Sequence, residues 1–262
     1  MLPDRALIGM IHVGALPGTP HARKPIEALV AAAAADARVL ALAGFDALLI
    51  ENMHDRPYVN RHGPETTACM TRLALAVRQA VPDRPLGVQV LSAGHAEALA
   101  VAHAVGADFI RVENFVFAHV ADEGLMPDAV AGPLLRYRRQ IGAQRVRIFA
   151  DIKKKHASHA LTADVSIADA AHAAEFFGAD GLIVTGAFTG RPADADDLAA
   201  VRAASKLPLW VGSGVTPANL AETFRHADAA IVGSSIKRGG VWSNPVDPAR
   251  AKALVRARSR RS

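Results

Sequence analysis

The chain of 262 residues is long enough for one large domain or two small ones, and α/β barrels of about 250 residues commonly form a single domain. Hydrophobic residues make up 51% of the chain and aromatic residues only 5%, which suits a core of small and branched side chains between helices and a parallel sheet. The net charge of +5 does not indicate a nucleic-acid surface, because six cations and no acid occupy residues 250–262, which leaves −1 for the rest.

Short apolar segments that suit buried parallel strands recur along the chain, and each is followed by a polar loop and a longer amphipathic segment. The predicted strands are Leu7–Val13, Ala47–Glu51, Leu86–Leu91, Phe109–Glu113, Val146–Asp151, Gly181–Thr185, Leu209–Gly212 and Ala229–Gly233. The predicted helices are Ile26–Ala43, Pro64–Ala80, Ala93–Val105, Ala129–Ile141, Ile167–Phe177, Asp194–Ser205, Pro217–His226 and Pro248–Arg258.

Eight such units without a dinucleotide-binding fingerprint predict an α/β fold, a single (β/α)8 TIM barrel domain over residues 1–262. An open, doubly wound sheet is the structural alternative, because it also alternates strands with helices. We expect the basic tail at about 250–262 to be a solvated helix end that frays.

Several helix boundaries carry suitable local chemistry. Ser166 precedes the helix at Ile167 as an N-cap, and Thr216 precedes Pro217, which is predicted to be the first residue of its helix. Three predicted helices end in a Gly-x-Asp sequence, in which one residue separates the glycine from an Asp, and the next strand begins directly after it. These glycines are Gly44, Gly106 and Gly178. Such short turns are typical of the stability face of a barrel, so the longer loops at the opposite end should carry function.

Two glycine-rich turns, Gly212-Ser213-Gly214 and Gly233-Ser234-Ser235, follow the predicted seventh and eighth strands. In barrels the loops after these strands commonly bind phosphate, because glycine lets backbone N–H groups approach the oxygens, and the serines could add hydroxyl donors. Alternatively, the glycines only form tight turns between strand and helix. Their joint position favours a phosphorylated small molecule as the ligand.

The fifth predicted strand ends in several ionisable residues. Asp151, Lys153 and Lys155 share one face if the backbone stays extended, so a carboxylate and an ammonium could converge over the barrel mouth. Such a pair can move a proton next to a carbonyl, and a lysine could instead form a Schiff base. His156 is a further acid/base candidate, whereas we expect Lys154 to belong to an exposed cationic loop.

Polar residues also end the other predicted strands and should gather at the same mouth. They are His12, Glu51, Asn52, Gln89, Arg111, Glu113, Asn114 and Thr185. Glu51 is assigned an acid/base role, and His12, Asn52, Arg111, Glu113 and Thr185 are assigned to ligand binding. Arg111 and Glu113 have the same side-chain parity, so a simple salt bridge between them is the alternative.

No motif implies a cofactor or metal. Glu51, His54, His62, Asp151 and His156 include plausible ligands, but their spacing does not define a zinc site, and Mg²⁺ beside a substrate phosphate stays an open alternative. Ser213 lacks the context of a nucleophile elbow, so a serine hydrolase is not expected. Without a recognisable signal peptide or transmembrane segment, we expect a cytoplasmic protein without nucleic-acid partners, and a homo-oligomer stays open.

An ordered set of short motifs over nearly the whole chain resembles the BtpA/SgcQ family. The matching segments are Gly9-Met10-Ile11-His12, Leu16-Pro17-Gly18, Ile50-Glu51-Asn52, Gly63-Pro64-Glu65-Thr66, Gly106 to Val112, Ala150-Asp151 to His156, Val184-Thr185-Gly186 and both glycine-rich turns. The resemblance implies a phosphate-binding TIM barrel. It also implies a link to photosystem I biogenesis in cyanobacterial members and to sugar metabolism in other bacteria.

Two functions from different classes follow. The first is an enzyme of phosphosugar or nucleotide-sugar metabolism, of the isomerase, epimerase or lyase type, with Asp151, Lys153, His156 and Glu51 as acid/base groups. The alternative is a noncatalytic assembly or regulatory factor, of the photosystem I biogenesis type, that uses the barrel as a scaffold. The many ionisable groups at the strand ends favour the enzyme.

Overall fold

The computed structural model describes residues 2–186, 188 and 190–259 and contains a closed barrel of eight parallel strands. Around the barrel the strand order is β1-β11-β10-β9-β7-β4-β3-β2. Their bounds are β1 Ala6–His12, β2 Ala47–Glu51, β3 Leu86–Gln89, β4 Phe109–Val112, β7 Arg147–Ile152, β9 Gly181–Val184, β10 Leu209–Val211 and β11 Ala229–Val232. The predicted TIM barrel is confirmed, and the open sheet is wrong because β1 pairs with both β2 and β11.

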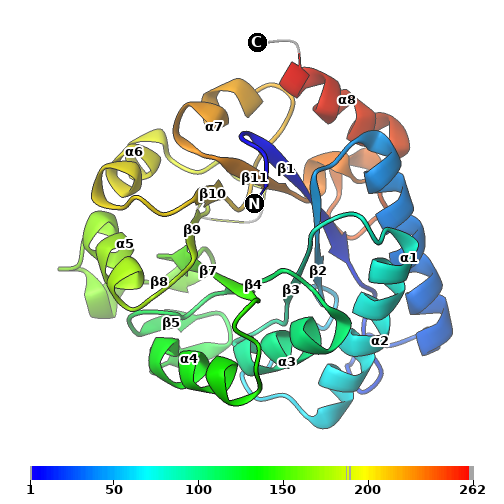
Figure 1. Ribbon diagram of the computed structural model, residues 1–262, viewed down its shortest axis with the longest axis horizontal. Coiled ribbons are helices and arrows are strands. Elements are labelled where there is room, and N and C mark those ends of the chain that lie inside the picture. The colour runs from blue at the N-terminus through cyan, green and yellow to red at the C-terminus, as the bar shows by residue number, and fades with distance from the viewer. Residues whose placement is uncertain (1, 187, 189, 260–262) are drawn as a thin grey trace.

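Eight α-helices of the described chain surround the strands, as Figure 1 shows in a view along the barrel. Their bounds are α1 Ile26–Ala43, α2 Pro64–Ala80, α3 His95–Val105, α4 Ala131–Gln140, α5 Ile167–Phe176, α6 Ala195–Ala204, α7 Leu220–His226 and α8 Pro248–Ser259. Each lies within a few residues of its predicted range. None of these helices is both long enough and apolar enough to cross a membrane, as judged over the described residues.

Two apolar layers form the core. The larger lies between strands and helices, and the smaller fills the barrel itself with side chains that include Phe109, Phe149 and Trp210. The rings of Phe149 and Trp210 are stacked with centroids 3.5 Å apart, and Phe109 meets Trp210 edge-on at 5.1 Å. These aromatic side chains fill the barrel below the strand ends, so any cavity along the barrel axis has to lie above them.

The αβ turns at the opposite face follow one pattern. Gly44, Gly106 and Gly178 have positive φ values of 98°, 71° and 86°, as their predicted role as helix ends requires. The Asp that follows each glycine, and Asp228 in a fourth turn, accepts a backbone N–H from a strand and an arginine side chain; for Asp108 these are Leu86 N–H at 2.9 Å and Arg78 at 2.7 Å. The turns thus stabilise the barrel, as expected.

The two predicted N-termini differ in outcome. Ser166 forms a capping box with Asp169 at the start of α5, as predicted. The prediction for Pro217 is wrong, because α7 begins only at Leu220. Asn219 accepts hydrogen bonds from the Thr216 N–H and hydroxyl instead, so the intervening residues form a turn.

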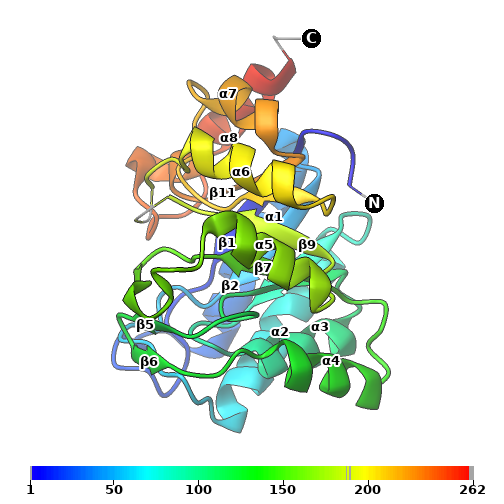
Figure 2. The same ribbon diagram turned by 90° about the vertical axis from the view of Figure 1, so that its left-hand side faces the viewer.

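A small antiparallel sheet that was not predicted lies over one side of the barrel. It consists of β5 (His119–Ala121), β6 (Gly124–Met126) and β8 (Ala157–Ser158), in the order β6-β5-β8. It joins the loop after β4 to the loop after β7, and Figure 2 shows β5 and β6 on the side of the molecule opposite the N-terminus. Strands of two and three residues carry too little periodicity to be recognised in a sequence.

The basic tail is more ordered than expected. Helix α8 continues to Ser259, Arg258 forms an ion pair with Asp46, and Arg250 donates from Nε to the Ser235 carbonyl at 2.8 Å. The prediction that this end frays is therefore wrong for Arg250 and Arg258, while Arg250 is exposed to solvent as expected. Residues 260–262 lie outside the described part of the chain.

Candidate functional site

A cavity of about 540 Å³ lies at the carboxyl ends of the barrel strands. The interior-facing positions of the strands change there from apolar to polar: Met10 is followed two residues later by His12, and Leu49 by Glu51. The same step leads from Phe109 to Arg111. The predicted residues that line this cavity are His12, Glu51, Gln89, Arg111, Glu113, His156, Gly212, Ser213, Gly214, Gly233, Ser234 and Ser235. The two glycine-rich turns and the charged strand ends therefore face one space.

The serine hydroxyls of the two turns do not have equal roles. The Ser213 hydroxyl accepts from Gly186 N–H at 3.0 Å and donates to the Arg191 carbonyl at 3.2 Å. The Ser235 hydroxyl donates to the Val215 carbonyl at 2.6 Å. Each hydroxyl has one hydrogen, so neither can also donate to a ligand. Within the described chain the Ser234 hydroxyl makes no hydrogen bond, which leaves it as the candidate donor.

Gly214 is required for the packing of the turn after β10. Its φ of 72° is left-handed, and a Cβ there would lie 2.2 Å from the Arg191 carbonyl oxygen. The loop after β9 therefore rests directly on this turn. The Ser213 hydroxyl holds the same loop, so Ser213 and Gly214 shape the cavity wall.

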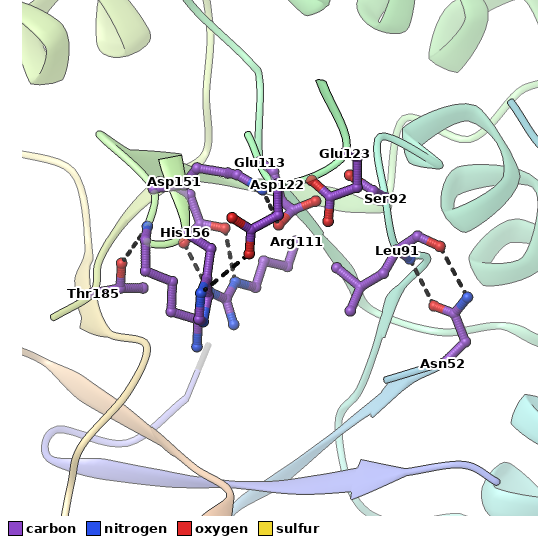
Figure 3. A network of polar contacts seen from close by, with 12 residues as sticks. Asn52, Leu91, Ser92, Arg111, Glu113, Asp122, Glu123, Asp151, His156 and Thr185 are labelled. Carbon is purple, nitrogen blue, oxygen red and sulfur yellow. Dashed lines mark hydrogen bonds and ion pairs between the residues drawn. The ribbon is translucent and has the colours of Figure 1, made fainter. Parts of the chain in front are cut away.

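Arg111 and Asp151 form a buried ion pair at the base of the cavity. Nε and Nη2 of Arg111 donate to the two carboxylate oxygens of Asp151, both at 2.9 Å, as Figure 3 shows. Burial opposes the charge of Arg111, but the Asp151 carboxylate outweighs it and the pKa of Arg111 is raised. Asp151 does not line the cavity, where a catalytic role was predicted for it, and its place is that of a buried partner for Arg111. The alternative salt bridge between Arg111 and Glu113 is wrong.

Glu113 instead pairs with Lys154, whose ammonium lies 3.1 Å from Glu113 and 3.9 Å from Glu123 in the β5–β6 turn. Burial alone would lower the pKa of Lys154, but the two carboxylates raise it; the pKa of Glu113 is lowered by Lys154 despite burial. The prediction that Lys154 is exposed is wrong, because only 5% of its surface is accessible. Lys154 connects the barrel to the small sheet.

Glu51 and His12 lie side by side in the cavity wall, with Glu51 Oε2 3.6 Å from His12 Nε2. Burial raises the pKa of Glu51 from 4.5 to about 7, and burial with the nearby Lys237 ammonium lowers the pKa of His12 to about 3. His12 Nδ1 lies 3.0 Å from the Trp242 carbonyl, which can only accept, so Nδ1 carries the proton of the neutral ring. The lone pair of Nε2 therefore faces a carboxyl group that exchanges its proton near neutral pH.

The residues after β7 do not follow the predicted alternation. The strand ends at Ile152, and positive φ values of 46° at Lys153 and 56° at His156 turn the chain. Lys153 is directed away from the main cavity into a small neighbouring pocket, so its predicted place is wrong. Lys155 and His156 line the cavity, and His156 Nδ1 lies 3.6 Å from Asp122.

Asn52 and Thr185 position the backbone near the site but do not line the cavity, contrary to prediction. The Asn52 side chain accepts from Leu91 N–H at 2.6 Å and donates to the Leu91 carbonyl at 3.0 Å and to Asp55 at 2.8 Å. Figure 3 shows the paired bonds to Leu91. The Thr185 hydroxyl accepts the Lys155 N–H at 3.1 Å.

Sequence reasoning missed part of the cavity rim, which is formed by Arg56, Tyr58, Asp122, Glu123, Trp242 and Arg250. These residues come from long βα loops, from the small sheet and from α8, where no periodic pattern indicates direction. The Arg56 guanidinium lies over the Trp242 ring, 4.7 Å from its centroid. The sequence contained one weak indication of this rim, because Trp242 is one of only two tryptophans in the chain and follows the last barrel strand, β11.

A metal site requires several ligating side chains around one point of the cavity. No group of three or more His, Cys, Asp or Glu side chains is arranged to hold an ion in the part of the chain that the structure describes. Two of the acidic groups near the cavity pair with cations, Asp151 with Arg111 and Glu113 with Lys154. The chain itself therefore provides cations, N–H groups and the Ser234 hydroxyl for an anionic ligand.

Fold and cavity together define the class of this protein as a (β/α)8 barrel with a charged site at the carboxyl ends of its strands. A structural neighbour is (S)-3-O-geranylgeranylglyceryl phosphate synthase of Thermoplasma acidophilum, solved with its substrate sn-glycerol-1-phosphate. It has a TM-score of 0.57 and 15% identity, and the match covers 97% of this chain and 93% of the neighbour. At this identity the likeness shows the fold alone.

The chain belongs to the BtpA family, whose family model matches residues 3–260. An uncharacterized mitochondrial protein of Caenorhabditis elegans is 44% identical over 257 residues, which cover 95% of this chain and 91% of the relative. The photosystem I biogenesis protein BtpA of Synechocystis is 34% identical over 253 residues, which cover 96% of this chain and 87% of the relative. The family resemblance of the sequence motifs is thereby confirmed.

Proposed function

We propose that this BtpA-family protein is an enzyme that binds a phosphorylated small molecule and moves a proton on it. One observation carries the proposal: the two glycine-rich turns and the buried Glu51 line the same cavity. The phosphate would lie at the turns after β10 and β11, and the reacting part of the ligand would lie toward Glu51 and Arg111. The phosphorylated substrate of the structural neighbour is consistent with such a ligand.

The turn after β11 is suited to a phosphate group for two reasons. Ser234 and Ser235 begin a 3-10 helix (Ser234–Ile236), whose first N–H groups have no acceptor within the helix. Arg250 reaches the same turn from α8 and adds a permanent positive charge. Backbone donors, the Ser234 hydroxyl and a guanidinium together match the oxygens and the charge of a phosphate monoester.

Glu51 supplies the acid/base group. Because its pKa is raised to about 7, the carboxyl group can both take and return a proton at neutral pH. When a proton leaves carbon beside a carbonyl, negative charge develops on the carbonyl oxygen, and the Arg111 cation in the same cavity would stabilise it. This chemistry is common to isomerases, epimerases and lyases that act on phosphosugars or nucleotide sugars. His156 remains a further candidate at the rim.

A noncatalytic role as an assembly factor is the second candidate, and the Synechocystis relative named for photosystem I biogenesis favours it. In that case the barrel would bind its ligand or partner without turnover. Proton exchange on a bound ligand separates the two candidates, because a scaffold has no need of it.

The phosphate site is tested by calorimetric titration with inorganic phosphate and with phosphorylated sugars. Ser234→Ala should weaken binding about tenfold or more, because a hydrogen bond to a charged group is lost, and should leave the unfolding free energy unchanged. Ser213→Ala is the matched control: it removes a hydroxyl that bonds the loop after β9, so it should lower stability by about 1–3 kcal/mol and affect binding less. Equal binding by the wild type and Ser234→Ala would contradict the phosphate site.

Proton transfer is tested by incubating the protein in deuterated water with a panel of phosphorylated aldoses and ketoses and following carbon-bound deuterium by NMR. The wild type should incorporate deuterium into at least one sugar, and Glu51→Gln should slow this by about 100-fold or more. A ligand that binds to the wild type without any exchange would support the scaffold instead.

A further inference from the structure

Lys155 is an ionisable group of the cavity that the proposed proton transfer does not use. It lines the cavity, and its backbone N–H is fixed by the Thr185 hydroxyl at 3.1 Å. A Cβ at Gly212 would lie 2.9 Å from the Thr185 methyl group and 3.2 Å from Arg111 Nη2. The Thr185 side chain thus contacts both the Lys155 backbone and the first glycine-rich turn.

The surroundings of the Lys155 amine differ from those of its neighbour Lys154. Lys154 has carboxylates at 3.1 and 3.9 Å, whereas Lys155 has no ion pair or side-chain hydrogen bond with any residue that the structure describes. Burial lowers the pKa of Lys155, and the Arg111 cation lowers it further, although Glu51, Asp151 and Glu113 act in the opposite sense. The pKa values of these two adjacent lysines are therefore shifted in opposite directions, and Lys155 is the one whose amine can be neutral.

We propose that Lys155 is a covalent amine, whose Nζ forms an imine with the carbonyl carbon of a phosphorylated aldehyde or ketone. The amine lone pair attacks the carbonyl carbon, a C–N bond forms, and the carbonyl electron pair takes up a proton to give a carbinolamine. The hydroxyl then leaves as water, which carries away the carbonyl oxygen and, in sum, the two protons of the amine. No oxidant or reductant is needed.

Glu51 is placed to relay the protons of these steps. It lines the same cavity, and its charge and that of Lys155 influence each other's pKa. The protonated imine would withdraw electrons from the neighbouring C–H or C–C bond more strongly than the carbonyl does. The inference rests on the proposed function and narrows its substrate class to carbonyl compounds that carry a phosphate.

Pyridoxal 5′-phosphate is a suitable probe, because it joins an aldehyde to a phosphate and its imine is made permanent by borohydride. The full-length protein is treated with the probe, reduced and digested, and the modified lysines are identified by mass spectrometry. Lys155 should be modified at least about tenfold faster than the exposed Lys206, because the cavity would hold the phosphate of the probe beside its amine and its lowered pKa leaves more of the amine neutral. Inorganic phosphate should slow the modification of Lys155 and not that of Lys206.

Variants and a second probe make the outcomes distinct. Lys155→Arg should lose the fast modification, and the matched control Lys206→Arg should keep it. The proposal is overturned if Lys155 reacts no faster than Lys206, or if Lys154 is modified in its place. If pyridoxal without phosphate modifies Lys155 equally fast and inorganic phosphate does not compete, the covalent role of Lys155 is supported and the proposed phosphate site is contradicted. If inorganic phosphate binds and Lys155 stays unmodified, the phosphate site is supported and the covalent role of Lys155 is contradicted.

Discussion

At the scale of single residues, Glu51 and His12 have opposite effects on the pH dependence of stability. Glu51 has a raised pKa, so its native state holds a proton between pH 4.5 and about 7 that the unfolded chain has released. The contribution of Glu51 to the free energy of unfolding is complete below pH 4.5 and is lost as the pH rises to about 7. His12 has a lowered pKa, so its contribution appears as the pH rises from about 3 to 6.5.

Replacement of Glu51 separates the two effects. The wild type should lose roughly 3 kcal/mol of unfolding free energy between pH 4.5 and 7.5 relative to Glu51→Gln, because the variant has no carboxyl group to titrate. Urea denaturation at a series of pH values measures the difference. Parallel curves for the two proteins over this range would show that the pKa of Glu51 is not raised.

At the scale of elements, the small sheet β6-β5-β8 is held to the barrel by Lys154. Its ammonium joins Glu113, which follows β4, to Glu123 between β5 and β6, and His159 binds its backbone carbonyl at 3.0 Å. A second ionic contact of the sheet is weaker, since the Asp122 carboxylate lies 3.6 Å from His156 Nδ1 and the Asp122 side chain is largely exposed. The buried pair therefore determines how firmly this sheet covers the cavity.

Lys154→Met should destabilise the protein by about 3–5 kcal/mol, because the buried Glu113 carboxylate loses its partner. Hydrogen exchange should accelerate first at residues 119–126. Addition of Glu113→Gln to this variant should recover part of the stability, since the unpaired charge nearest to Lys154 is removed and only the more distant Glu123 carboxylate stays without its cation. Unchanged exchange in the small sheet, with faster exchange in the barrel strands, would refute this role for Lys154.

At the scale of the whole molecule, stability and ligand binding belong to opposite ends of the barrel. The four αβ turns at Asp46, Asp108, Asp180 and Asp228 each bind a strand N–H and an arginine, while the cavity lies at the carboxyl ends of the strands. A change at the turns should therefore leave the site intact.

Asp108→Ala should lower the unfolding free energy by about 1–3 kcal/mol, because it removes the bonds to Arg78 and to Leu86 N–H. Phosphate affinity should stay within about twofold of the wild type. Asp83→Ala, at an exposed carboxylate before the same strand β3, is the matched control and should change stability by less than about 0.5 kcal/mol. Loss of phosphate binding in folded Asp108→Ala would show that the two ends are coupled.

The sequence by itself determined the barrel, its orientation and the two turns that face the cavity. Apolar runs and helical periodicity are local signals that repeat eightfold, and the Gly-x-Asp turn recurs three times, so errors at single boundaries, such as Pro217, did not change the fold. Strand parity also placed His12, Glu51 and Arg111 at one mouth, because alternation holds as long as a strand continues.

Only the tertiary structure decided the pairing and direction of the charged side chains. The left-handed backbone at Lys153 broke the alternation, so Lys153 faces a neighbouring pocket while Lys155 lines the cavity. The partners of Arg111 and Lys154 come from strands and loops 40 and 41 residues apart, and Arg250 reaches the cavity from the last helix. Ion pairs depend on distance and burial in the closed barrel, and a residue pattern contains neither quantity.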